Sequence, residues 1–471
     1  MQKKNWIFRI GKIVVVCLLT VSANAYSQVN FNITADNIKS ANLYVDNGST
    51  TFATVLSVAP TINLSASSST LTNGNGATVN VNQVTARIIG TGGGVANLLD
   101  IATVPTITLS TSPQAIYSSL IGTLAGGRIT LRYTLPNLSA TIWRAGTYTT
   151  NLNFALIGIN IGTLSPTIVP LNINVAAFVT IPASLSAVQL DINSLNYYRS
   201  QTASTTQNVL FTATVPVGIR LRSNTSAFTY SNGYSGAADP ATTVNRTGVQ
   251  ITSPTASTMV NPVTSYTNLT SAGGLSVPAG NQQTNTFTYS ISPANLKLGF
   301  KQKGTYTANL TQEYFDAGSP VQATSKSISY PVTVNVADIA ELKVNHTDVN
   351  LVFNSVSRYA NGVNADMSNH LTLSKTTPYE VYVKASGTTL NSANGTLPIS
   401  IIDILPVPAS GSNFNTVTLS ASSQKLFSSA VAEIDRVLSV RYSVPASKVA
   451  QLLSKPATTY NTTITYTMVA P

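Results

Sequence analysis

The stretch LRYTLP at residues 131–136, followed by GTYTTNLNF at residues 146–154, holds the pattern from which the fold of this chain can be predicted. Apolar and polar residues alternate in both segments, and this is the period of a β-strand with one buried face. Pro136 ends the first segment, and Gly146 permits the turn that opens the second. The two segments therefore predict two strands joined by a proline turn, with Tyr148 packed in a core.

The same order of strand, proline turn and tyrosine-opened strand occurs two more times. The second copy reads FTYSISP and GTYTANLT, and the third reads VRYSVP and TTYNTTITY, at residues 287–293, 304–311, 440–445 and 458–466. The strand-opening tyrosines Tyr148, Tyr306 and Tyr460 lie 158 and 154 positions apart. A period of this length is that of a domain, not of a solenoid repeat. The chain therefore predicts three related domains in tandem.

The recurring tyrosines and glycines have a structural explanation. A tyrosine at a strand opening can bury its ring in a sandwich and donate its hydroxyl to a backbone carbonyl, as in a tyrosine corner. A glycine in front of it permits the turn. We therefore interpret the motif as structural and not as a set of ligand contacts; its residues are Tyr133, Gly146, Tyr148, Tyr289, Gly304, Tyr306, Tyr442 and Tyr460.

Three further similarities connect the copies. The segments PLNINVA at 170–176 and PVTVNVA at 331–337 read as closing strands of the first two domains, and the third copy shows no such segment after Tyr466. Residues 106–119 return in similar form at 416–429. Two segments at the front of the second and third domains also match, namely VQLDINSL at 188–195 and VNLVFNSV at 349–356. Repeated agreement of this kind indicates copies of one folding unit.

The predicted fold class is accordingly all-β, with three tandem immunoglobulin-like or pilin-like β-sandwich domains after a signal peptide. The first domain is expected at residues 26–177 and the second at 178–338, where residues 224–285 read as long loops. The third domain is expected at residues 339–471 without the closing hairpin. Below, repeats 1, 2 and 3 denote these three segments.

Residues 1–25 have the features of a secretory signal peptide. Four basic residues precede an apolar run that is too short to cross a bilayer, and Ala23-Asn24-Ala25 fits the small-residue cleavage rule. The single cysteine, Cys17, lies inside this leader, so the mature chain is expected to contain no disulfide. We therefore expect an exported protein at the cell surface, outside the cell or in the periplasm, which does not span the membrane after cleavage.

The charge of the chain favours some partners over others. The 471 residues include 26 Lys and Arg and 15 Asp and Glu, which gives a formal net charge of +11. These charges are scattered among Thr, Ser and Asn without a basic run or a basic helix, which does not fit a nucleic-acid interface. A surface polysaccharide and a second copy of the chain remain the expected partners, and no nucleic acid is expected.

The order of tyrosine, proline turn and Gly-Thr-Tyr resembles the carboxy-terminal part of spore-coat-protein-U-type domains, the pilin-like sandwiches of archaic chaperone–usher fibres. The resemblance rests on Tyr442, Pro445 and Ala446 for the turn and on residues 146–148 for the strand opening. It implies an immunoglobulin-like sandwich and a role in fibre assembly. The chain departs from that family in lacking mature cysteines and in having Thr458 where the glycine stands. Its leader and Asn/Thr-rich composition also resemble exported Bacteroidetes proteins.

Few residues in the sequence suggest catalysis. The two histidines, His346 and His370, lie 24 positions apart without a metal-ligand spacing, and we interpret them as solvated or capping residues. The closest acidic residues, Glu433 and Asp435, stand beside Arg436 and read as a solvated strand face or loop. We therefore expect no enzyme activity, no cofactor and no metal, with a hydrolase or hydrolase accessory as the third-ranked alternative.

Two binding hypotheses remain open. Exposed aromatic side chains can stack on sugar rings, and Trp143, Tyr230 and Tyr234 are the candidates for a glycan contact. The segment that contains Val29, Phe31 and Ile33 alternates like a strand, and it is the candidate donor for an unpaired edge in repeat 3 of another molecule. The alternative to the donor strand is that the unit naturally ends at its last predicted strand. The preferred function is a structural or adhesive surface protein, with a glycan-binding module as runner-up.

Overall fold

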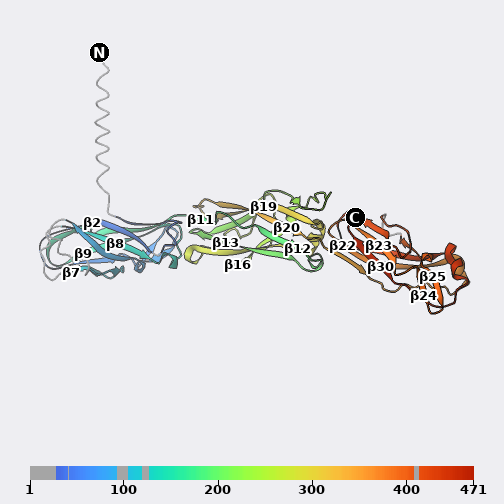
Figure 1. Ribbon diagram of the computed structural model, residues 1–471. Helices are drawn as coiled ribbons and strands as arrows, with labels where there is room; N and C mark the ends of the chain where they lie inside the picture. Colours follow the sequence, from blue (N-terminus) through green and yellow to red (C-terminus); the bar gives the residue numbers. More distant parts are fainter. Residues whose placement is uncertain (1–27, 41, 93–103, 119–126, 408–412) are drawn as a thin grey trace, which may run out of the picture.

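The computed structural model describes residues 28–40, 42–92, 104–118, 127–407 and 413–471. The predicted leader lies outside the described residues. The described chain is built of β-strands with short helical turns, as the alternating pattern predicts, and Figure 1 shows the three repeats arranged end to end in a row. Three separate clusters of buried side chains form the cores, one for each repeat apart from a few residues at the boundaries. The all-β fold class predicted from the sequence is therefore the observed one.

In repeat 1 the long strand β2 pairs with three other strands, β7, β8 and β9, and so joins the two sides of the sheet. It pairs with β8 through its first part and with β9 and β7 through its second part, so one continuous ladder turns around the core. The elements are β1 (Val29–Ile33), β2 (Asn42–Ala66), β3 (Thr70–Thr72), β4 (Thr78–Asn80), η1 (Val81–Gln83), β5 (Thr85–Gly92), β6 (Ile107–Thr108), β7 (Gln114–Ser118), β8 (Gly127–Pro136), η4 (Leu138–Ala140), β9 (Gly146–Ser165) and β10 (Ile168–Val175).

Repeat 2 packs a four-stranded sheet, β11-β13-β18-β16, on a six-stranded sheet built around β12-β20-β19-β14. Its elements are β11 (Val179–Thr180), β12 (Val188–Ile192), α2 (Asn196–Arg199), β13 (Ala203–Ala213), β14 (Val217–Ser223), β15 (Thr229–Ser231), η5 (Val244–Arg246), β16 (Gly248–Ser253), β17 (Thr267–Asn268), η6 (Ala279–Asn281), β18 (Gln282–Ile291), α3 (Pro293–Gly299), β19 (Gly304–Asp316) and β20 (Lys326–Val336). Residues 224–285 are not only loops, because β16 pairs with β18 and buries Val249 and Ile251.

Repeat 3 has a five-stranded sheet, β21-β22-β29-β26-β27, a three-stranded sheet, β28-β23-β30, and a separate hairpin. Its elements are β21 (Ala340–Val344), α4 (Val356–Asn361), β22 (Gly362–Lys375), β23 (Tyr379–Ala385), β24 (Thr389–Ser392), β25 (Gly395–Pro398), η7 (Ile399–Ile401), β26 (Asp403–Pro406), β27 (Val417–Thr418), β28 (Gln424–Ser429), β29 (Glu433–Pro445), η9 (Ala446–Leu452) and β30 (Ile464–Val469).

The motif tyrosines make the same contact in all three repeats. The hydroxyls of Tyr148, Tyr306 and Tyr460 donate to the backbone carbonyl four residues earlier, at 3.1, 2.8 and 2.9 Å. This is the geometry of a tyrosine corner, because the ring packs under the sheet while the hydroxyl fixes the preceding turn. Tyr148 and Tyr306 are fully buried, whereas Tyr460 is only half-buried. Repeat 3 therefore covers its corner less completely than the other two repeats do.

The two similar segments of repeats 1 and 3 also fold alike. The Gln114 side chain donates to the Thr108 carbonyl and to the Ser110 hydroxyl, both at 2.9 Å. Gln424 makes the same two contacts, with the Thr418 carbonyl and with Ser420, both at 2.8 Å. A side chain that satisfies two loop groups in each copy explains why this stretch of sequence recurs.

The contacts between repeats 1 and 2 are buried. Asn281 donates to the carbonyl oxygens of Trp143 and Ala213, both at 2.7 Å, and accepts from the Trp143 amide at 3.0 Å. The Ala145 amide donates to the Thr214 carbonyl at 2.9 Å. Since Asn281 is fully buried and each contact is short, this junction is held by a satisfied polar group inside an apolar shell.

The contacts between repeats 2 and 3 combine partly exposed ion pairs with hydrogen bonds of the buried Thr376, which accepts from the Lys303 amide and donates to the Ala337 carbonyl, both at 2.8 Å. The Asp435 carboxylate forms ion pairs with the Arg199 guanidinium and the Lys297 ammonium group, each at 2.8 Å. Arg199 also forms an ion pair with Glu341. Partial burial opposes ionisation of Asp435, but the two cations hold its pKa below the ordinary value. Because these side chains are partly exposed, salt screens this junction more than it screens the buried one.

Candidate assembly site

Repeat 3 has an unfilled strand position among its described residues. In repeat 1, β10 lies between β1, with which it is parallel, and β9, with which it is antiparallel. In repeat 2, β20 lies in the same way between β12 and β19. Residues 349–353 match β12 in sequence and β30 matches β19, but within the described chain no strand pairs with residues 349–353 or with the outer edge of β30.

The side chains that border this position are only half-buried. Their counterparts in β12, β19 and β9 are nearly all fully buried: Val188, Leu190 and Ile192 are at most 3% exposed, and Leu310, Gln312 and Tyr314 at most 1%. The bordering residues of repeat 3 alternate between half-buried and exposed, and the half-buried ones face the core of the repeat; they are Val349, Leu351, Phe353, Tyr460, Ile464, Tyr466 and Met468. We call the unpaired edge of β30, together with the row at residues 349–353, the acceptor groove.

The strands β10 and β20, which fill the equivalent position in repeats 1 and 2, show which kind of segment fits it. In β10 the residues Leu171, Ile173 and Val175 are buried, and in β20 Val332, Val334 and Val336 are buried, with polar residues between them. The outward residues pair with the neighbouring strand, as in the contact of Asn335 with Asp191 at 2.9 Å. An occupant of the acceptor groove is therefore an extended segment with alternate β-branched or leucine side chains.

A cluster of polar rings lies beside the acceptor groove. The His370 Nε2 atom is 2.9 Å from the Tyr442 hydroxyl, which shares a hydrogen bond of 2.5 Å with the Tyr466 hydroxyl of β30. The His370 ring stacks on His346 with centroids 6.1 Å apart and meets Tyr466 edge-on at 5.6 Å. His370 is 1% exposed, and its Nδ1 atom has no partner among the described residues. The expectation of a solvated or capping His370 is therefore wrong.

The burial of His370 predicts that repeat 3 is sensitive to acid. Burial, together with the neighbouring His346, lowers the pKa of His370 to about 4. The unfolded chain, with a histidine pKa of about 6.5, binds the proton more readily, so the stabilisation is complete above that pH and is lost as the pH falls towards 4. We expect a decrease from pH 7 to pH 5 to lower the free energy of unfolding of repeat 3 by about 2 kcal/mol through this residue.

Urea unfolding of the wild type and of His370→Gln, followed at both pH values, measures this effect. The difference in stability between the two proteins should shrink by that amount at pH 5. His346→Gln is the comparison variant, because the His346 ring stacks on His370 but its side chain is exposed. A difference between wild type and His370→Gln that does not change with pH would contradict the assignment.

The proposed glycan contacts do not come together. Trp143 is fully buried, its Nε1 atom donates to the Leu138 carbonyl at 2.9 Å, and its ring meets Tyr148 edge-on. The prediction that Trp143 could stack on a sugar is therefore wrong, because the ring fills the end of repeat 1 at the junction. The sequence signal for this was the neighbouring tyrosine corner, which needs a large apolar partner.

Tyr230 and Tyr234 lie near the other end of repeat 2. The Tyr230 hydroxyl donates to the Lys303 carbonyl at 2.5 Å, and its ring packs 5.0 Å from the Tyr306 ring. A Cβ atom on Gly304 would lie 2.5 Å from the Tyr230 ring, so this glycine is required both for its positive φ of 145° and for space. Tyr230 is thus engaged in packing, and Tyr234 is half-buried beside it.

The candidate donor strand is not free. Val29, Phe31 and Ile33 form β1, which pairs in parallel with β10 of its own repeat from Val29–Leu171 to Ile33–Val175. All three side chains are fully buried. The hypothesis that this segment joins another molecule is corrected accordingly, because leaving β10 would expose three large apolar side chains at a cost of about 2 kcal/mol each.

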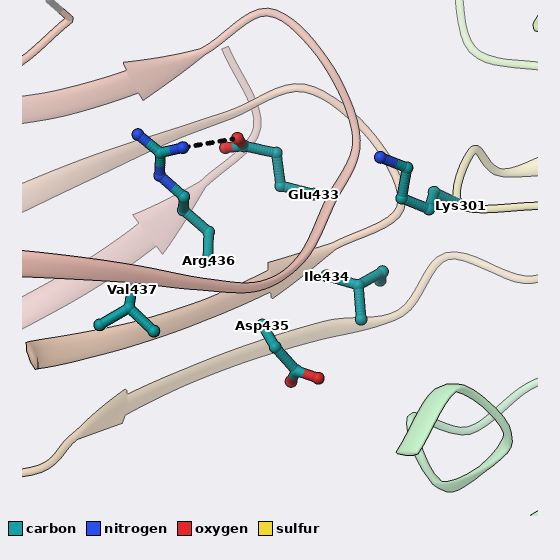
Figure 2. Close-up of a pocket in the computed structure, with 6 residues that line it drawn as sticks. All are labelled: Lys301, Glu433, Ile434, Asp435, Arg436 and Val437. Atoms are coloured by element: carbon teal, nitrogen blue, oxygen red, sulfur yellow. Dashed lines mark ion pairs between the residues drawn. The ribbon is translucent and has the colours of Figure 1, made fainter. Parts of the chain in front are cut away.

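A polar hollow marks the boundary of repeats 2 and 3. The hollow has a volume of about 420 Å³. Figure 2 shows the six residues that line it, which are Lys301, Glu433, Ile434, Asp435, Arg436 and Val437. Glu433 accepts from the Tyr379 hydroxyl at 2.8 Å and lies 3.7 Å from Arg436, and Asp435 is held by the two cations of the junction. Both carboxylates are therefore engaged in structural contacts and do not form a pair of free acids.

The described residues hold neither a metal-ligand cluster nor a helix long enough to span a membrane. No three His, Cys, Asp or Glu side chains in the described ranges lie close enough together to hold a metal ion. In the same part of the chain, no helix has the length and apolar character needed to cross a membrane.

Comparisons with known proteins give a distant likeness only. No family model and no curated protein matches the chain. A mutant of the CFA/I adhesin CfaE of enterotoxigenic E. coli is 11% identical with a TM-score of 0.28, covering 66% of this chain and 97% of its own. The CsuC–CsuE chaperone–tip subunit complex of Acinetobacter baumannii is 14% identical with a TM-score of 0.30, covering 62% and 99%. A three-immunoglobulin fragment of titin is 8% identical with a TM-score of 0.19, covering 93% and 95%. These scores are too low to carry a functional argument.

Proposed function

We propose that this protein is an exported structural or adhesive element of the cell surface, built of three β-sandwich domains in tandem, which joins an assembly by accepting a strand from a partner subunit. The acceptor groove of repeat 3 is the observation that carries the proposal. A sheet edge with free backbone groups and a row of half-buried apolar side chains is a template for strand addition.

The partner strand is proposed to come from another protein. Among the described strands with the required pattern, β10 and β20 are already paired on both edges, and β12 is buried against β20. The strand β1 is buried against β10 in its own repeat. A second copy could supply any of them only by opening one of its own cores. A partner that carries an extended segment without a fold of its own avoids that cost.

Binding of a synthetic strand to the intact protein tests the proposal. The probe is a peptide with the sequence of residues 328–338, ISYPVTVNVAD, labelled with a fluorophore and followed by anisotropy. We expect saturable binding, and we expect a peptide with Asp at the positions of Val332 and Val334 not to bind. A groove that binds neither peptide at any accessible concentration would overturn the proposed function.

Neighbouring residues offer matched variants. Leu351 belongs to the half-buried row that borders the acceptor groove and packs against the core, whereas Val352 is 46% exposed on the opposite side. Leu351→Asp places an uncompensated charge against the incoming strand, and we expect it to weaken peptide binding by about 30-fold or more. Val352→Asp adds the same charge facing solvent and should change the affinity less than about twofold. Equal effects of the two substitutions would show that binding occurs elsewhere; circular dichroism checks that both variants fold.

A further inference from the structure

The neighbours of the buried closing strand differ between repeats 1 and 2. The closing-strand residue that pairs with the fourth residue after the motif tyrosine differs in the same way. In repeat 2, Tyr330 of β20 is the residue paired with Leu310 of β19. The Tyr330 hydroxyl shares a hydrogen bond of 2.6 Å with Tyr289 and accepts from the Gln312 side chain at 2.9 Å. Tyr330 is 1% exposed, so the strand β20 brings a hydroxyl into a buried polar cluster.

Repeat 1 has an apolar version of the same position. Val169 of β10 pairs with Leu152 of β9, the counterpart of Leu310 by its distance from the motif tyrosine. Phe154 stands where Gln312 stands in repeat 2. Both Val169 and Phe154 are buried, at 1% and 4% exposed. Val169 thus lies beside Phe154, and neither side chain has a polar group. A hydroxyl or amide at either position would be buried without a hydrogen-bond partner, which costs free energy.

Among its described residues, repeat 3 has the polar lining but no strand in this position. Tyr466 of β30 stands where Gln312 stands, and Tyr442 stands where Tyr289 stands. Their two hydroxyls and the His370 Nε2 atom form one connected set. The Nδ1 atom of His370 completes the set as a buried polar atom that has no hydrogen-bond partner among the described residues. A buried ring nitrogen without a partner costs free energy until a donor or an acceptor reaches it.

We propose that the strand which occupies the acceptor groove carries a hydroxyl side chain, a tyrosine in the simplest case, at the position opposite Ile464, where it hydrogen-bonds the cluster of His370, Tyr442 and Tyr466. This selectivity rests on the proposed function, because it specifies the partner of the same groove. A hydroxyl suits either tautomer of His370, since it can donate to or accept from Nδ1. The position opposite Ile464 follows from repeat 2, where Tyr330 pairs with Leu310, because Ile464 is the counterpart of Leu310 in repeat 3.

Two pairs of peptides isolate the hydroxyl. The first pair is residues 328–338 with Tyr330 and with Tyr330→Phe, which differ by one oxygen atom. The second pair is residues 167–177, TIVPLNINVAA, carrying Val169→Tyr or Val169→Phe. In each pair we expect the tyrosine peptide to bind the wild-type protein about 10-fold more tightly, as one satisfied buried hydrogen bond allows. Equal affinities within both pairs would overturn the inference and leave the proposed function standing.

The histidine itself provides an independent readout. We expect the ¹⁵N resonances of the His370 ring to shift when the tyrosine peptide binds and to shift much less with the phenylalanine peptide. This measurement needs no substitution in the buried cluster and so avoids variants that fail to fold. Ring resonances that respond alike to both peptides would contradict a direct contact. Failure of all four peptides to bind would instead overturn the proposed function, so the two failures are distinguishable.

Discussion

Replacing Trp143 with alanine is expected to lower the free energy of unfolding of repeat 1 by about 4 kcal/mol. The ring is fully buried, meets Tyr148 edge-on with centroids 6.1 Å apart, and donates to the Leu138 carbonyl. Its removal leaves a cavity at the end of the core and an unpaired carbonyl oxygen. The backbone of Trp143 also holds Asn281, so the cavity opens next to the contact between repeats 1 and 2.

Urea unfolding monitored by circular dichroism measures this loss, with Ile142→Ala as the control. Ile142 precedes the tryptophan and is 46% exposed, so its substitution should cost less than about 1 kcal/mol. A Trp143→Ala protein as stable as Ile142→Ala would mean that the ring is not packed as described. The same comparison tests the correction of the glycan hypothesis, since an exposed sugar-binding tryptophan would be dispensable for stability.

Replacing Asp316 with alanine is expected to destabilise repeat 2 by about 3 kcal/mol. The Asp316 carboxylate is 4% exposed and accepts from the amides of Gly318, Gln322 and Ala323 at 2.8, 2.6 and 2.9 Å. It thus closes the connection between β19 and β20. Hydrogen bonds to a charged acceptor are stronger than those between neutral groups, and the alanine variant leaves three donors without a partner.

Asp239→Ala is the matched control for this substitution. Asp239 accepts a single amide, that of Ala241 at 2.8 Å, in an exposed loop of the same repeat. We expect a loss below about 1 kcal/mol there. Limited proteolysis should cut residues 317–325 faster in Asp316→Ala and not in Asp239→Ala. An Asp316 variant that resists both urea and protease like the wild type would contradict the role assigned to the carboxylate.

Alternation and recurrence in the sequence predicted much of this fold. The all-β class, the strand openings at Gly146 and Gly304 and the closing strands at residues 170–176 and 331–337 are where the pattern places them. The reason is physical: a period of two residues has one structural meaning when one face is buried, and a tyrosine hydroxyl in a core needs a carbonyl nearby. The sequence pattern predicted a strand best where the residues that alternate in the sequence are also the ones buried in the core.

Other features depended on residues far apart in the chain. Residues 349–353 have the pattern of β12 but are not a strand, because a strand forms only with a partner and the described chain offers none there. Arg199 meets Asp435, 236 positions away, and no local pattern encodes that contact. Burial of His370 likewise follows from tertiary packing. The candidate groove was therefore visible in the sequence only as a missing copy, and its polar lining was not visible.

The parallel pairing of β1 with β10 has a mechanical consequence. The chain enters this ladder at Val29, opposite Leu171, and leaves it at Val175, opposite Ile33. A pull on the two ends of repeat 1 therefore acts along the ladder from opposite sides, so its hydrogen bonds share the force in shear instead of opening one by one. β12 and β20 repeat the arrangement in repeat 2. Among the described residues of repeat 3 no strand completes the corresponding ladder; under the proposed function, a partner strand in the acceptor groove would complete it and make this repeat resistant to tension as well.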